Sequence, residues 1–266
     1  MNPKSISFLL VISALTACGG SSDGTAVSPT QPAPQPQPSA SAAVLETFDD
    51  GSGVARAETT SDGFTFVANV MGPDIQGTVN EINSGVPLAA DYINDQFVGS
   101  NQYGDFYSAQ TFVNGQLVDV LLYVDINDIV TIAYGEGAGS NLLLAGGEKV
   151  SNIPSGTFTY TGTNVVGNRD GSASEDGTFT MGVNFNTQQA SINGSTPSTT
   201  IDATDISVNN VNGTFSTTNL NLGINGNQFQ GTLLGNFHGD GAVGVSGIYH
   251  DNGGDPGVAG AIAGTR

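Results

Sequence analysis

The chain is poor in cysteine, tryptophan and positive charge. One cysteine and no tryptophan occur among its 266 residues, and a single cysteine excludes an intramolecular disulfide. Five basic residues stand against 24 acidic ones, which gives a formal net charge of −19. Such a charge opposes binding to nucleic acid or to an anionic membrane face. It would attract a basic partner, but solubility in an extracellular or oxidising setting is the simpler explanation.

The patterns of common catalytic and nucleotide sites are also missing. No serine stands in a nucleophile elbow, and no phosphate-cradling loop or dinucleotide fingerprint occurs. Neither of the two histidines, His238 and His250, has a recognisable role as a catalytic base. We therefore predict that the chain is not an enzyme and binds no cofactor. A pair of loop carboxylates of the glycosidase kind remains an open alternative, because acidic residues are frequent in the loops.

Two groups of residues offer the side-chain types that hold metal ions. His238 and His250 lie near Asp240, Asp251 and Asp255, and such side chains ligate metals in other proteins. Their spacing follows no known ligand motif. We therefore interpret both histidines as polar residues at or just beyond strand ends, and we predict no metal site.

The segment 125–128 contains part of the pattern of a calcium loop. Asp125, Asn127 and Asp128 supply oxygen ligands, but the glycine and the closing glutamate are not at the required positions. A turn between two strands is the preferred interpretation.

Residues 1–17 have the features of a lipoprotein signal peptide. Lys4 gives the positive start, and residues 6–15 form an apolar segment too short to span a bilayer as a helix. The motif LTAC then ends at Cys18, where a lipobox would place the lipid-bearing cysteine. The alternative is an ordinary secretory signal with an incidental cysteine. We predict lipidation at Cys18, and the absence of an aspartate after it, at Gly19, favours the outer membrane.

Residues 18–43 have the composition of a tether. They are rich in Gly, Ser, Thr, Gln and Pro, and prolines alternate with other residues over 32–38. Such a segment cannot bury a core, and it extends as polyproline II. We predict that it spaces the folded part from the membrane. A proline-rich ligand for a recognition domain is the alternative.

The sequence pattern of residues 44–151 predicts a first β domain. Apolar and aromatic residues alternate over 63–70, 105–113, 116–124 and 129–134, and Asn114-Gly115 is a typical hairpin turn. Its aromatic side chains are interpreted as core, with a binding patch as the alternative. These residues are Phe106, Tyr107, Phe112, Tyr123 and Tyr134.

The sequence pattern of residues 152–266 predicts a closed barrel. Alternation is clean at Phe179, Met181, Val183 and Phe185, with polar residues or glycine between them. Eight strands close into a barrel that side chains can fill, so we expect a packed interior and no ligand cavity. The predicted strands are 156–166, 177–185, 188–194, 199–208, 213–222, 228–237, 242–249 and 257–265.

The last of these strands carry a family resemblance. FHGDGA at 237–242, VSGIY at 245–249 and VAGA at 258–261 resemble the closing signature of the transferrin-binding protein B-like β-barrel lipoproteins. The factor H-binding lipoproteins share this barrel. The family pattern has proline, glutamate and glycine where this chain has Asp240, Gly244 and Ser246. The resemblance covers residues 153–266.

The resemblance implies an all-β fold, in which a smaller β handle domain (44–151) precedes an eight-stranded antiparallel barrel (152–266). It also implies a lipid-anchored outer-membrane protein, exposed on the cell surface. Its partner would be an extracellular protein or an iron or haem carrier, captured through loops of barrel and handle. No ligand-binding residue can be carried over, because the recognition loops have no common motif. The alternative is a structural or envelope-associated lipoprotein without a small-molecule ligand.

Overall fold

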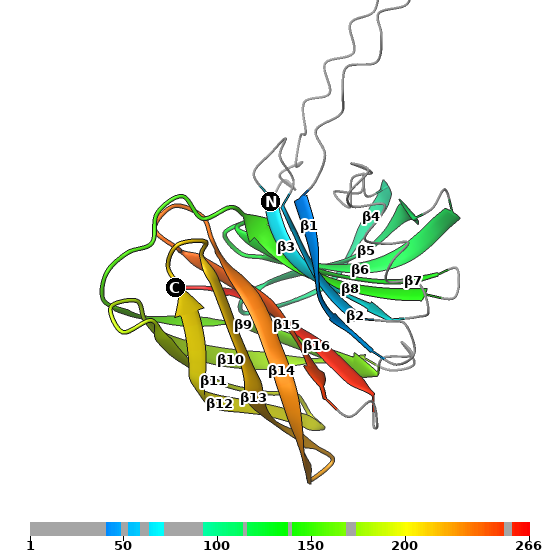
Figure 1. The fold of residues 1–266 in the computed structure, drawn as a ribbon. Coiled ribbons are helices and arrows are strands. Elements are labelled where there is room, and N and C mark those ends of the chain that lie inside the picture. Colours follow the sequence, from blue (N-terminus) through cyan, green and yellow to red (C-terminus); the bar gives the residue numbers. More distant parts are fainter. Residues whose placement is uncertain are drawn as a thin grey trace, which may run out of the picture. The chain divides into compact units, whose positions relative to one another are not determined.

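The computed structural model contains two groups of antiparallel strands (Figure 1). All of the strands fall within one compact unit, residues 37–266. The predicted signal peptide, Cys18 and nearly all of the tether lie outside the described residues, as do Asn114-Gly115 and Asp255. No described helix is long and apolar enough to cross a membrane. The structure describes residues 41–48, 53–58, 64–71, 93–113, 116–137, 140–168, 174–252 and 257–266.

The first group is an eight-stranded sheet in the order β1-β2-β3-β8-β7-β6-β5-β4. The predicted strands correspond to β3, β5, β6 and β7, whereas β1, β2, β4 and β8 were not predicted. The β region expected ahead of the barrel is confirmed, and it has as many strands as the barrel. The strands are β1 (Ser41–Thr47), β2 (Gly53–Glu58), β3 (Phe64–Met71), β4 (Ile93–Asn101), β5 (Gly104–Val113), β6 (Gln116–Asp125), β7 (Val130–Gly137) and β8 (Ser140–Glu148).

The second group is a closed barrel in which β16 pairs with both β15 and β9. All eight predicted strands are present, and closure removes exposed edges from this half of the chain. The strands are β9 (Thr157–Asn168), β10 (Ser174–Asn184), β11 (Gln189–Ser195), β12 (Thr199–Asn209), β13 (Thr214–Ile224), β14 (Asn227–His238), β15 (Gly244–Asp251) and β16 (Val258–Thr265).

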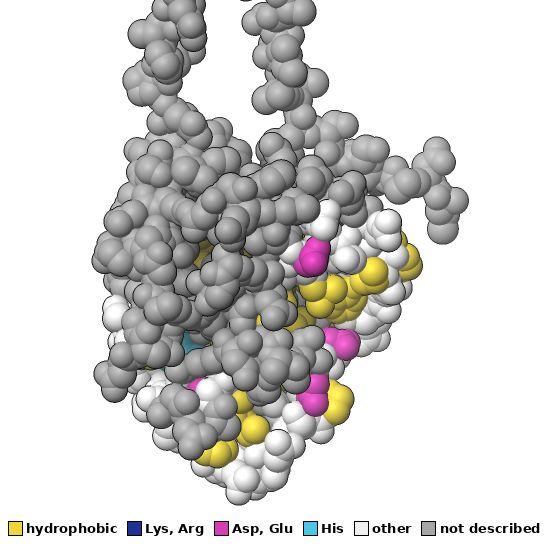
Figure 2. Space-filling view, turned by 90° about the vertical axis from the view of Figure 1, so that its right-hand side faces the viewer, with side chains coloured by type: hydrophobic (Ala, Val, Ile, Leu, Met, Phe, Trp, Pro, Cys, Tyr) yellow, Lys and Arg dark blue, Asp and Glu magenta, His cyan; other side chains and the backbone are white. Residues whose placement is uncertain are grey.

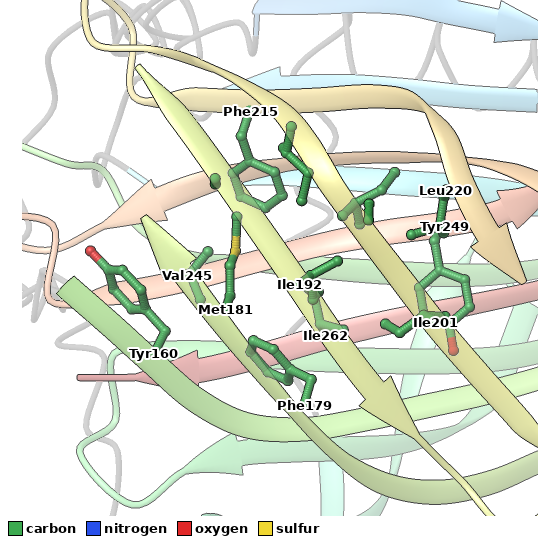
Figure 3. Packing of buried hydrophobic residues seen from close by; sticks show 14 of the residues in the cluster. Tyr160, Phe179, Met181, Ile192, Ile201, Phe215, Leu220, Val245, Tyr249 and Ile262 are labelled. Atoms are coloured by element: carbon green, nitrogen blue, oxygen red, sulfur yellow. The ribbon is translucent and has the colours of Figure 1, made fainter. Parts of the chain in front are cut away.

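Large apolar side chains fill the barrel interior (Figure 3). The predicted inward set Phe179, Met181, Val183 and Phe185 is fully buried there, which confirms the orientation expected from alternation. The ring of Phe237 contacts other interior rings on several sides, with centroid separations of 5.0–5.9 Å. The interior is thus a packed core of the kind that eight strands produce.

The sheet packs against the outer face of one side of the barrel. Ala259, Ala261 and Ala263 of β16 form one cluster with Tyr123 and Ile132 of the sheet. Small side chains allow the two layers to approach closely. As a result, β15 is buried on both faces along its whole length. On β11 and β12, buried and exposed residues alternate, because their outer face meets water.

Candidate functional site

The predicted place of His238 at a strand end is confirmed, but its side chain is not exposed on a loop. It ends β14, is fully buried, and points from the outer face of the barrel toward the sheet. Its Nε2 lies 2.8 Å from Ser246 Oγ, and its Nδ1 lies 3.1 Å from the carbonyl oxygen of Glu148. Burial lowers the pKa of the imidazole to about 4, since charge is costly away from water. His238 therefore acts as a neutral hydrogen-bonding residue between barrel and sheet.

His250 also lies near a strand end, as the next-to-last residue of β15, and it too is buried. Its Nε2 lies 3.0 Å from Glu46 Oε2, and its ring meets that of Phe48 edge-on at 4.9 Å. The contacts of His250 are thus with the start of the sheet, whereas His238 contacts β8. The two rings are not brought together, and no group of three metal-ligating side chains occurs in the described part of the chain.

The acidic turn after β6 is stabilised from within. Both carboxylate oxygens of Asp125 accept backbone hydrogen bonds: Oδ1 from Ile129 (2.6 Å) and Val130 (2.7 Å), and Oδ2 from Asn127 (2.9 Å). Asn127 Nδ2 in turn donates to Thr265 Oγ1 at 3.1 Å, which ties this turn to the last barrel strand. The turn interpretation of this segment is confirmed, because the carboxylate of Asp125 shapes the backbone.

Other acidic residues near the histidines also hold loops in place. Asp240 accepts hydrogen bonds from Ser151 Oγ at 2.8 Å and Asn152 Nδ2 at 2.6 Å, and these bonds lower its pKa. They join the β14–β15 turn to the segment between sheet and barrel. Asp251 Oδ1 accepts from the backbone N–H of Val258 at 2.8 Å, which fixes the start of β16.

Glu175 has the same structural role on the barrel. Its Oε2 accepts hydrogen bonds from the Ser198 backbone N–H (3.0 Å), Ser198 Oγ (2.8 Å) and Thr196 Oγ1 (2.9 Å). These bonds lower the pKa of Glu175, because they favour its ionised form. The carboxylate anchors the β11–β12 loop.

The described basic side chains are all engaged within the chain. Arg56 lies at the sheet–barrel junction, donates from Nη2 to the carbonyl of Gly235 at 3.2 Å, and has a pKa lowered by burial. Lys149 pairs with Glu58. Arg266 donates to the carbonyl of Gly241 at 2.7 Å and places its guanidinium 3.9 Å from the centroid of the Phe158 ring. Each of these three basic side chains therefore has an interaction within the chain.

Exposed apolar side chains gather on β4, at one edge of the sheet. Phe97 is 61% exposed and Val98 is 56% exposed, and the Phe97 ring meets Tyr107 edge-on at 6.0 Å. The side of the molecule that carries β4 to β7 in Figure 1 faces the viewer in Figure 2. There, hydrophobic side chains lie beside carboxylates.

Sequence reasoning missed this edge. The signal was an apolar Phe-Val pair inside the polar segment INDQFVGSN. The predicted core assignment holds for Tyr123, which is fully buried, while Phe106 and Tyr134 are partly buried against the barrel. The side chain of Phe112 lies outside the description.

Comparison with known proteins gives structural matches only. No family model matches the chain, and no curated protein does. Transferrin binding protein B of Haemophilus parasuis, as a double mutant, matches at 14% identity and a TM-score of 0.45, over 65% of this chain and 38% of that one. A mutant of the protein from Actinobacillus pleuropneumoniae matches at 13% identity and a TM-score of 0.41, over 64% and 96%.

Isotype 1 of the same protein, from serogroup B Neisseria meningitidis, matches at 12% identity and a TM-score of 0.46, over 81% of this chain and 65% of that one. For comparison, this chain spans only 38% of the length of the Haemophilus parasuis protein named above. These solved structures, all of transferrin binding protein B, are what the chain is similar to.

Proposed function

We propose that this chain is a lipid-anchored protein of the outer membrane, displayed on the cell surface, that captures an extracellular protein or an iron or haem carrier. The packed barrel interior is the observation that carries the proposal. Rings and aliphatic side chains fill it, and the sheet covers the outer face of β15 and β16. Ligand contact is therefore left to the loops, the polar barrel strands and the sheet.

The roles of the acidic and histidine residues support binding over catalysis. Asp125, Asp240 and Glu175 each use their carboxylates to hold backbone or loops, and His238 and His250 are buried between barrel and sheet. Catalytic acids and bases need access to a substrate. These residues are therefore poor candidates for a reaction centre and good candidates for a rigid scaffold that presents loops.

Membrane attachment and domain division are part of the same proposal. Cys18 would carry the lipid, residues 18–43 would act as a spacer, and residues 44–151 and 152–266 would be the handle and barrel domains. Several acyl chains at about 0.8 kcal/mol per buried methylene would hold such a protein firmly to a membrane.

Protease shaving of intact cells tests the surface display. Cells are treated with a protease that does not cross the outer membrane, and the barrel is detected with an antibody, alongside a periplasmic protein as control. We expect the barrel to be digested while the control survives. Purified protein is then used to capture iron carriers, haem and host proteins. Digestion only after the outer membrane is breached would overturn the proposal.

A structural envelope role is the second candidate, and the barrel surface favours it. The outer faces of β11 and β12 are polar along their length, with exposed residues such as Asn193, Asp202 and Ser207. Such a face lacks the aromatic anchors that dominate binding sites. Protection of the barrel in intact cells would make this the leading function.

A further inference from the structure

A row of mostly apolar residues, paired from strand to strand, crosses the sheet and ends at its edge strand β4. Phe97 of β4 pairs with Tyr107, Tyr107 with Leu122, Leu122 with Ala133, and Ala133 with Leu144 of β8. Leu122, Ala133 and Leu144 belong to one buried cluster on this face, and Tyr107 packs against it. Burial decreases along the row until Phe97 is 61% exposed. The core of this face therefore continues onto the surface.

The strand that carries Phe97 is the last strand of the described sheet on this side. An edge strand presents unpaired backbone N–H and C=O groups to any extended segment that approaches it. The register shifts between Phe97 and Gly99, so Val98 has no partner residue on β5, and a second shift lies between Ile93 and Gln96. Such bulges interrupt long, regular pairing. A short segment fits this edge better than a continuous second sheet.

The negative charge at and around this edge indicates which kind of partner would bind there. The exposed carboxylate of Asp105 lies beside the row, where it accepts a hydrogen bond from Tyr107 Oη at 3.4 Å. The chain has a net charge of −19, and Arg56, Lys149 and Arg266 are engaged internally. A second copy would bring its own Asp105 and the same net charge to the contact. Like charges facing each other oppose association, whereas a basic segment is attracted both by the carboxylate of Asp105 and by the net negative charge of the chain.

We propose that the β4 edge, formed by Phe97, Val98, Tyr107 and Asp105, is a docking site for a basic, extended segment of a partner protein. An apolar side chain of that segment packs on Phe97 and Val98, and a lysine or arginine lies beside Asp105. The inference rests on the proposed binding function, since it assigns a surface to the partner.

Three synthetic decapeptides test the docking chemistry at physiological salt against the full-length chain in detergent. The first alternates Lys with Phe and Val, the second replaces Lys by Glu, and the third replaces Phe and Val by Ser. Fluorescence anisotropy gives each dissociation constant. We expect saturable binding of the first peptide, and binding at least about tenfold weaker for the other two, because both charge and apolar contact are required.

Surface variants then locate the site. In Phe97→Ser/Val98→Ser and in Asp105→Asn, the first peptide should bind about tenfold more weakly, as when a binding anchor is removed. Val211→Ser and Asp202→Asn are the matched controls, because Val211 is 96% exposed and Asp202 is exposed on the barrel. Both controls should bind as the wild type does. Urea midpoints check that every variant is folded.

Three results would overturn the docking site. The first is that the first peptide shows no saturable binding. The second is that Phe97→Ser/Val98→Ser binds this peptide as tightly as the wild type does. The third is that the wild type forms a dimer in sedimentation experiments and this variant does not. The proposed function fails separately, in the shaving and capture experiments. If wild type and Phe97→Ser/Val98→Ser capture the same ligand equally well, the binding function stands and the β4 edge is excluded as its site.

Discussion

Tyr249 and Gly260 are partners across β15 and β16, and the tyrosine ring occupies the space that a side chain at residue 260 would need. A β-carbon there would lie 2.2 Å from Tyr249 Cζ, and the ring is fixed by a 2.8 Å hydrogen bond from its hydroxyl to Asn164 Oδ1. Gly260→Ala should therefore lower the free energy of unfolding by about 2 kcal/mol, as overpacking does. Urea denaturation measures this change.

The control for that experiment is Gly182→Ala on β10. A β-carbon at Gly182 meets only Ser191 Oγ, at 3.5 Å. Its effect should stay within about 0.5 kcal/mol, which is usual for tolerated surface changes. Equal effects of the two substitutions would contradict the packing of Tyr249 on Gly260.

Removing the carboxylate of Asp125 should destabilise the chain. Asp125→Ala leaves the backbone N–H groups of Asn127, Ile129 and Val130 without their acceptor, and the bond to Val130 is buried. We expect a loss of about 2 kcal/mol in the free energy of unfolding. Asp128→Gly is the control: Asp128 has a φ of 58°, which glycine adopts readily. A neutral Asp125→Ala would show that the turn does not depend on this carboxylate.

His238 should make stability depend on pH. Its folded pKa of about 4 lies below the ordinary value of 6.5, so the unfolded chain binds a proton first as the pH falls. The stabilisation is complete above about pH 6.5 and is lost between there and pH 4, a change on the order of 3 kcal/mol. Urea unfolding at pH 7.5 and 4.5 measures it.

His238→Gln is the matched variant for the pH experiment. Glutamine keeps hydrogen-bonding capacity toward Ser246 and Glu148 but does not titrate. Contributions from other groups, such as Glu175, are common to both proteins and cancel. The wild type should lose about 2 to 3 kcal/mol more than the variant between the two pH values. Parallel pH profiles would contradict a buried, neutral His238.

The sheet–barrel contact is tested at Ala261. This residue is fully buried on the outer face of β16, in the cluster shared with the sheet. Ala261→Glu places a carboxylate where water is excluded, and it should cost about 3 kcal/mol or more in unfolding free energy. Ser207→Glu, on the exposed outer face of β12, should have little effect. Tolerance of both changes would show that the sheet does not cover β16.

Membrane attachment is expected to depend on Cys18. Cys18→Ala should move the protein from the membrane fraction to the soluble fraction and abolish incorporation of labelled fatty acid. Ser22→Ala, a few residues further along, should change neither. Continued lipid labelling of the cysteine variant would disprove the assignment.

The barrel strands β10, β11 and β12 were predictable because their outer face meets water. On β10, Phe179 and Met181 are buried while the threonines at 178 and 180 are exposed, so the local sequence records both faces. β8 was not predictable in this way. Leu143 and Ala145 contact the barrel side while Leu144 belongs to the opposite cluster. With both faces covered, the alternation disappears.

The environment of the histidines could not be predicted for a related reason. Alternation places His238 and His250 on the outer face of the barrel, where a side chain normally meets solvent. The sheet covers that face, and the contacts with Glu148 and Glu46 come from residues far away in the sequence. The apolar β4 edge escaped notice because Phe97 and Val98 form only one apolar pair in a polar segment. Local patterns thus revealed the strands but not which faces meet.

The pairing of β16 with β9 has a consequence for synthesis of the chain. While the ribosome is still making residues 258–265, β9 and β15 each lack the neighbour that covers one of their edges. Open edges recruit other strands, so a nascent or truncated chain is exposed to aggregation until its last strand is released. The same delay keeps the barrel open while a chain with the predicted signal peptide is being exported, since the barrel cannot close before residues 258–265 emerge.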